Sequence, residues 1–85
     1  VTIPNILTLN DDGANAVFLI DGLKENSSLV IINRWGNVVF ETTNYLNDWK
    51  GINKQSGDRV LDGVYTYLLT EPDGSKKHGF IHVVH

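Results

Sequence analysis

The chain alternates short apolar runs with stretches rich in Gly, Asn and Asp, and it contains no segment with a sustained helical period. Val17 to Asp21 is the first run with strand character, and Asp21-Gly22 closes it. Ser28 to Trp35 is apolar at successive positions, as in a central strand that is covered on both faces. The pattern therefore predicts an all-β domain with residues 28–35 at its centre.

Two hairpins follow from the turn residues. Trp35-Gly36-Asn37-Val38 lies between two apolar runs, which predicts a two-residue hairpin turn with Gly36 and Asn37 at its centre and residues 38–41 as the partner strand. Residues 64–70 and 80–84 alternate in polarity and are joined across Pro72-Asp73-Gly74, a typical turn sequence. We expect these two segments to form an antiparallel pair.

The stretch from Thr42 to Asp62 is rich in Asn, Asp, Lys, Ser and Gly, so we expect an irregular loop with Tyr45 and Trp49 as its anchors. Six or seven short strands at regular spacing favour an Ig-like antiparallel β-sandwich over a closed barrel. The alternation predicts these buried positions: Leu29, Ile31, Val39, Tyr67, Leu69 and Ile81.

Composition limits the fold to one small unit. The 85 residues are enough for a single domain, and 41% apolar against 20% charged residues is enough material for a core. The absence of cysteine excludes disulfides, thiolate zinc sites and a Cys nucleophile. Because the chain begins at Val1 and not at Met, we expect it to be a piece of a larger protein, as one domain over residues 1–85.

Charge and hydropathy exclude two classes of partner. The net charge of −3 and pI of about 5.4 provide no basic surface for nucleic acid or anionic lipid. The longest apolar runs, residues 16–20 and 29–32, fall far short of the roughly 20 residues of a transmembrane helix. We therefore expect neither nucleic-acid binding nor membrane insertion.

The usual catalytic and metal motifs are missing from the sequence. No serine lies in a Gly-x-Ser-x-Gly context, so a hydrolase triad is not indicated. His78 and His82 would share a strand face but lie about 13 Å apart along the strand, too far to bind one ion together. Both are expected to be ordinary strand residues.

The acidic stretch Asn10 to Asn15 is the most suggestive candidate for a calcium site. Asn10, Asp12 and Asn15 offer the oxygen ligands that Ca²⁺ prefers, but Leu19 stands where an EF-hand needs its bidentate Glu. The alternative is a tight turn in which Asx side chains bond the backbone. We expect no required cofactor and little stabilisation by calcium.

Aromatic and basic side chains leave two further interpretations open. A sugar-stacking platform of a carbohydrate-binding or adhesive module would use exposed aromatics, whereas a small core has first claim on them. The basic group could equally be an ordinary solvated surface. The aromatics are Trp35, Tyr45, Trp49, Tyr65 and Tyr67, and the basic residues are Arg34, Lys76 and Lys77.

Several motifs, in the same order along the whole chain, resemble one family. Ile3-Pro4-Asn5 with the stretch Thr8 to Ala16 resembles the opening IPNxFTPNGDGxND, although Leu9, Asp11 and Ala16 depart from it, as does His85 from the usual final Arg or Lys. Residues 33–41 (NRWGNVVFE) resemble NRWGxxVYE, and residues 45–51 (YLNDWKG) resemble YxNDWDG. Residues 61–67 (LDGVYTY) and 74–81 (GSKKHGFI) resemble LPxGTYYY and GxxKKGYV.

The chain is thus similar to the gliding motility-associated C-terminal domain, the type B sorting domain of the type IX secretion system. This resemblance implies a non-enzymatic signal at the C-terminus of an adhesin or other exported protein. It implies passage through the periplasm and the outer membrane to the cell surface or medium. The implied partners are the type IX translocon and a PorP/SprF-like outer-membrane β-barrel, and we expect a monomer. A structural spacer is a second rival to the sorting role.

Residues of these family motifs that lie in turns are harder to explain by packing than those in strands, so we expect the partner to bind the loops. Trp35 and Trp49 could instead pack together, with Asp48 bonding backbone amides and Arg34 bracing Asp48 or loop carbonyls. The last strand could also add to an edge of the partner barrel. The candidate recognition residues are Arg34, Trp35, Gly36, Asn37, Asp48, Trp49, Lys50, Gly51, Lys76 and Lys77.

Overall fold

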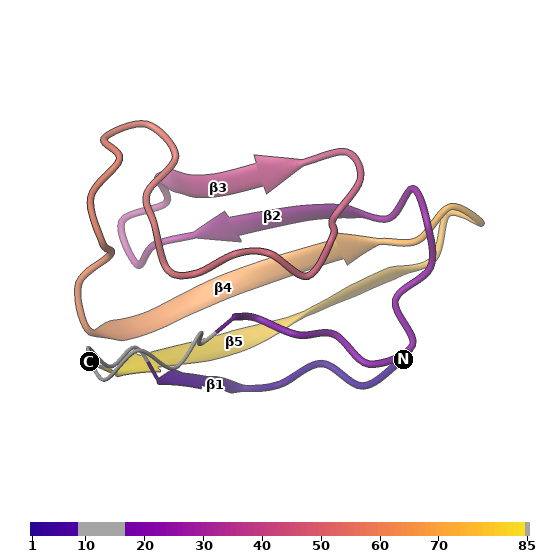
Figure 1. Ribbon diagram of the computed structural model, residues 1–85, viewed down its shortest axis with the longest axis horizontal. Coiled ribbons are helices and arrows are strands. Elements are labelled where there is room, and N and C mark those ends of the chain that lie inside the picture. The colour runs from indigo at the N-terminus through magenta and orange to yellow at the C-terminus, as the bar shows by residue number, and fades with distance from the viewer. Residues whose placement is uncertain (9–16, 85) are drawn as a thin grey trace.

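The computed structural model describes residues 1–8 and 17–84, and within these it contains five strands and no helix. The strands form one sheet in the order β1-β5-β4-β2-β3 (Figure 1). β1 pairs with β5 in parallel, and all other neighbours are antiparallel. The strands are β1 (Ile6–Thr8), β2 (Ser28–Ile32), β3 (Val38–Thr42), β4 (Gly63–Thr70) and β5 (Lys76–Val84).

The all-β prediction is confirmed, with two differences in detail. The described residues form five strands where six or seven were expected, and one pair is parallel. The predicted strand Val17 to Asp21 is wrong: this segment joins no ladder beyond an isolated bridge between Thr2 and Asp21. Its backbone bonds a loop instead, with the Phe18 N–H donating to the Trp49 carbonyl at 2.9 Å.

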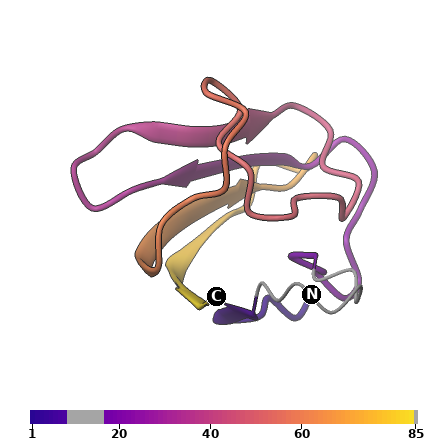
Figure 2. The same cartoon turned by 60° about the vertical axis from the view of Figure 1, so that its left-hand side comes forward.

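The second layer of the fold consists of loops. We call residues 17–23 and 43–60 the second layer. Most of them lie inside the curve of the sheet, while the stretch that includes Lys54 runs along the β3 edge (Figure 2). They contribute Phe18, Ile20, Tyr45, Trp49 and Val60 to one core cluster with the inward residues of the strands. The sandwich is therefore a sheet on one side and anchored loops on the other.

The predicted core is largely confirmed. Leu29, Ile31, Leu69 and Ile81 are fully buried and Val39 is 3% exposed, whereas Tyr67 is only partly buried at the side of the cluster. The prediction that β2 is covered on both faces is wrong. The described parts of the chain cover one face, and Val30 and Ile32 on the other are half-buried between neighbouring strands.

The β2–β3 turn is one residue longer than expected. Asn33 and Asn37 face each other, with the Asn33 N–H donating to the Asn37 carbonyl at 2.9 Å, so the loop is Arg34-Trp35-Gly36. Gly36 has φ 84°, which places it in the left-handed region that closes a three-residue hairpin loop. The expected two-residue turn centred on Gly36 and Asn37 is therefore wrong, because glycine takes the last loop position.

Candidate recognition surface

The β2–β3 turn holds Arg34 and Trp35 at its tip. The side-chain Oδ1 of Asn33 accepts the N–H groups of Trp35 at 3.0 Å and Asn37 at 2.9 Å, and the Asn33 carbonyl accepts the Gly36 N–H at 3.0 Å. These bonds satisfy the turn amides within the loop itself. The two tip side chains are therefore free to point into solvent.

Trp35 is 65% exposed, and the Arg34 guanidinium lies over its ring at 4.4 Å from the centroid. This stacking is a cation–π contact, worth about 0.5–1 kcal/mol at an exposed site. Trp35 does not pack against Trp49, which is 2% exposed and contacts Phe18 and Phe40 instead. Nor does Arg34 form an ion pair with Asp48 within the described residues. Both bracing interpretations are thus wrong for this turn.

The start of β4 completes the surface beside the turn. Leu61 is 72% exposed and Val64 is 49% exposed. These residues share a small cavity of about 60 Å³ with Arg34 and Trp35. We call Arg34, Trp35, Leu61 and Val64 the turn patch. It combines an aromatic, a permanent cation and two aliphatic side chains.

Tyr65 supports the turn patch from beneath. Its hydroxyl donates to the Leu61 carbonyl at 2.7 Å, an arrangement like the tyrosine corner of Ig-like sandwiches. Burial raises the pKa of the Tyr65 phenol, and the nearby Arg34 charge partly opposes that shift. The bond fixes the chain just before β4, so Leu61 and Val64 are held in place next to the turn.

The YLNDWKG stretch is mainly structural. Asn47 mimics a neighbouring strand: its Oδ1 accepts the Ile20 N–H at 2.9 Å and its Nδ2 donates to the Ile20 carbonyl at 3.3 Å. The Tyr45 hydroxyl donates to the Phe18 carbonyl and accepts the Trp49 N–H. Burial raises the pKa of Tyr45 to about 12. Tyr45 and Asn47 thus join the two halves of the second layer.

Trp49 and Gly51 also serve this loop, whereas Asp48 and Lys50 are exposed. The Trp49 indole N–H donates to the Ile52 carbonyl at 3.0 Å, and the Gly51 carbonyl accepts the Val60 N–H at 2.8 Å. Trp49 and Gly51 are buried, which agrees with the interpretation of Trp49 as a loop anchor. Of this candidate group, only Asp48 and Lys50 have exposed side chains.

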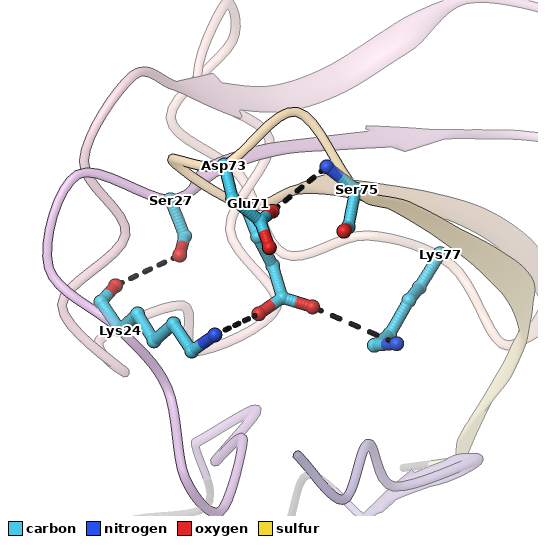
Figure 3. Close-up of polar contacts among 6 residues, drawn as sticks. All are labelled: Lys24, Ser27, Glu71, Asp73, Ser75 and Lys77. Carbon is cyan, nitrogen blue, oxygen red and sulfur yellow. Dashed lines mark hydrogen bonds and ion pairs between the residues drawn. The ribbon is translucent and has the colours of Figure 1, made fainter.

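Lys76 and Lys77 lie at the other end of the sheet. Lys77 Nζ lies 3.6 Å from Glu71 Oε1, and Lys24 Nζ lies 3.4 Å from Glu71 Oε2 (Figure 3). Glu71 is 8% exposed and was missed by the sequence reasoning. Glu71 stands just before the Pro72-Asp73-Gly74 turn and close to the lysine pair, and this position is the sequence feature that could have identified it. The ammonium group of Lys77 is therefore already paired with Glu71 within the fold.

The candidate residues do not converge on one site. The β2–β3 turn and the β4–β5 turn lie at opposite ends of the sheet (Figure 1), since β2 and β4 are antiparallel. The turn patch is at one end and the lysine pair is at the other. Of the five aromatics considered for sugar binding, three are buried, Tyr67 is partly buried, and Trp35 alone is exposed.

The remaining chemical candidates give no site in the described residues. No cluster of three or more His, Cys, Asp or Glu suited to a metal ion occurs among them. The calcium candidates Asn10, Asp12 and Asn15 lie outside the described residues. Within the described chain, no helix is long and apolar enough to cross a membrane.

The described part of the chain is an all-β domain with an exposed aromatic, a cation and aliphatic residues beside one turn. The sequence model of the CHU_C Type IX secretion signal domain matches residues 1–83. The chain therefore belongs to this family, which confirms the resemblance seen in its motifs. Domains of this family are in general not enzymes.

A solved structure supports the fold. The chain is similar to PorZ, described as an essential bacterial surface component of the type-IX secretion system of human oral-microbiomic Porphyromonas gingivalis. The TM-score is 0.60 at 24% identity, over 75% of this chain and 9% of the PorZ chain. No curated protein matches. Membership of the secretion signal family makes the domain a sorting signal for type IX secretion, which implies export across the outer membrane.

Proposed function

We propose that the turn patch is the surface by which the type IX machinery recognises this signal. The carrying observation is the 65% exposure of Trp35 on a turn that its own amides and Asn33 already hold. Trp35 does nothing for the core, and exposed Trp and Arg are the residues that dominate protein interfaces. Leu61 and Val64 extend the same surface with apolar area.

The proposed partner is a PorP/SprF-like outer-membrane β-barrel acting together with the translocon. The Arg34 guanidinium offers five donors in a planar fork, which suits a carboxylate on the partner. The contact with the Trp35 ring orients this fork. Among the described residues Arg34 forms no ion pair that would have to break on binding. The domain acts as a non-enzymatic monomer, and its parent protein ends at the cell surface or in the medium.

The test is export of a reporter fused to this domain in a bacterium with a type IX system. Trp35→Ala and Leu61→Ala are expected to lower export about tenfold, as loss of an interface hot spot does. Leu46→Ala is the matched control, because Leu46 is 67% exposed but lies in the second layer, away from the patch. All three purified domains are expected to keep their stability within about 1 kcal/mol, since the largest loss is the ring contact between Trp35 and Arg34.

One further strain and two contrary outcomes separate recognition from other causes. Deletion of the PorP/SprF-like barrel should retain the unaltered fusion inside the cell if that barrel is the partner. Normal export of the Trp35→Ala fusion, with an unchanged melting temperature, would show that the patch is not read. Equal losses for Leu46→Ala and Leu61→Ala would point to general surface hydrophobicity and likewise count against the patch.

A further inference from the structure

Strand β5 is paired on its outer edge over only part of its length. β1 covers it from His82 to Val84, and the His82 N–H also donates to the Asn5 carbonyl at 2.8 Å. Among the described residues the pairing stops there, because no hydrogen bond joins residues 1–5 to residues 76–80. The half of β5 nearer the β4–β5 turn, residues 76–80, therefore has an open edge, which we call the β5 edge.

The hydrogen-bond alternation shows which groups face this edge. The Ser75 carbonyl accepts the Glu71 N–H across the turn, and the His82 N–H donates outward to Asn5. The main-chain N–H and C=O groups of the even-numbered residues of β5 therefore point away from β4. The outward N–H and C=O groups of Lys76, His78 and Phe80 make no hydrogen bond within the described residues. Six main-chain groups are thus free for a further strand.

The opposite edge of the sheet is treated differently. On β3, the Lys54 N–H donates to the Val39 carbonyl at 2.8 Å and the Lys54 Nζ donates to the Glu41 carbonyl at 3.0 Å. The second layer therefore blocks this edge, as native proteins do with exposed strands. The β5 edge has no such cover from the described chain.

Side chains beside the β5 edge differ along its length. Lys76 is exposed and forms no ion pair within the described residues, while Lys77 is paired with Glu71. At the other end, Phe80 is 67% exposed beside its cross-strand neighbour Thr66. The surface of the β5 edge is thus cationic near the turn and apolar near β1.

We propose that the β5 edge binds an extended segment of a protein partner by strand addition. The segment carries a carboxylate opposite Lys76 and an apolar side chain opposite Phe80, and main-chain bonds to Lys76, His78 and Phe80 hold it. A second copy of this chain is a poorer match, since its own residues 76–80 contain no carboxylate. The proposal rests on the sorting function but not on the turn patch, which lies at the far end of the sheet.

The experiment titrates the isotope-labelled domain with the blocked peptide Thr-Glu-Thr-Glu-Thr-Val-Thr and with its reverse sequence. One peptide matches a parallel strand and the other an antiparallel strand. We expect the amide signals of Lys76, His78 and Phe80 to shift and their hydrogen exchange to slow with one of the two. The same peptides with Lys in place of Glu should bind at least about threefold more weakly, because they place a cation beside Lys76.

His78→Pro is the decisive variant and His78→Ala its matched control. Proline removes one outward N–H that the fold itself does not use, so an edge strand tolerates it. We expect peptide binding to weaken about threefold to tenfold in His78→Pro, as for one lost hydrogen bond, and to be unchanged in His78→Ala. Lys76→Glu leaves the backbone intact and should reverse the preference between the Glu and Lys peptides. This variant provides the test if His78→Pro does not fold.

The proposal is overturned if neither Glu peptide binds, if binding survives His78→Pro, or if the shifts map to the turn patch. It is also overturned if Lys76→Glu leaves the preference between peptides unchanged. The sorting function is judged separately, by export of the unaltered fusion. Trp35→Ala should leave peptide binding at the β5 edge intact, so failure of the turn patch and failure of the β5 edge give different results.

Discussion

The β2–β3 turn and the β4–β5 turn share one backbone plan. In each, the first residue donates its N–H to the carbonyl of the fifth, from Asn33 to Asn37 at 2.9 Å and from Glu71 to Ser75 at 2.7 Å. In each, a glycine at the fourth position donates to the first carbonyl, with φ of 84° for Gly36 and 93° for Gly74. The two loops are therefore equivalent in their main-chain frame.

They differ in where the first side chain goes. Asn33 turns back to bond the amides of its own loop, which leaves Arg34 and Trp35 at the tip in solvent. Glu71 turns into the fold and pairs with Lys24 of the connection before β2 and with Lys77 of β5 (Figure 3). One turn frame thus presents a recognition surface at one end of the sheet and anchors the chain at the other.

The largest expected effect concerns the second layer, which packs against the sheet that carries both turns. The pKa of Tyr45 is raised from 10.0 to about 12, so the neutral phenol stabilises the fold below pH 10 and this stability is lost as pH rises toward 12. We expect urea denaturation to show a loss of about 2–3 kcal/mol over this range. Tyr45→Phe should start less stable and show a smaller loss on the same titration, with the part due to Tyr65 remaining. An equal loss in both proteins would contradict the assignment to Tyr45.

Loss of the Glu71 ion pairs should cost less stability. Its effect should also distinguish the β4–β5 turn from the β2–β3 turn. Glu71→Ala removes a buried carboxylate from two lysines that are themselves partly exposed, so we expect about 2 kcal/mol of destabilisation. In a domain of this size that lowers the melting temperature by roughly 8–16 °C. Trp35→Ala at the other turn should change stability by no more than about 1 kcal/mol, from loss of the ring contact with Arg34. Similar losses in the two variants would remove the contrast between anchoring and presentation.

A smaller effect tests the shared frame itself. Gly36→Ala and Gly74→Ala place a Cβ in the left-handed region, with nothing within 4 Å for it to clash with. Each should cost about 1 kcal/mol from backbone strain alone, and the two values should agree within about 0.5 kcal/mol. Chemical denaturation of the two variants measures this. A large excess at Gly74 would mean that the β4–β5 turn depends on more than its backbone plan.

The smallest expected effect is local and depends on pH. The Ser75 N–H, which donates to Asp73 Oδ1 at 2.9 Å, lowers the pKa of this exposed carboxyl below 3.8. The stabilising contact is therefore present above that value and is lost as pH falls below it. The Ser75 amide signal should move in an acid NMR titration, whereas the Trp35 and Asn37 amides, held by the non-titrating Asn33, should not follow that transition.

Most of the sheet was predictable from the sequence alone. Alternation along residues 64–70 and 80–84 identified the β4–β5 pair, and the apolar run around Leu29 and Ile31 identified the inner strand. The prediction that Tyr45 and Trp49 anchor the loop from Thr42 to Asp62 is confirmed. Large aromatic side chains in a polar stretch are predictable anchors, because burying them contributes much apolar area to the core. Local pattern sufficed wherever a residue's role follows from its immediate neighbours.

The tertiary structure decided what depends on partners distant along the chain. Residues 17–21 have strand character, but their partner is the Asn47 side chain and the Trp49 carbonyl, so no ladder forms. The pairing of β1 with β5 and the burial of Glu71 likewise depend on contacts across long sequence separations. The sequence determined the alternation and the family, because these are read residue by residue. Which edge stayed open and which turn buried its first side chain were decided by packing, since each depends on segments that are distant along the chain.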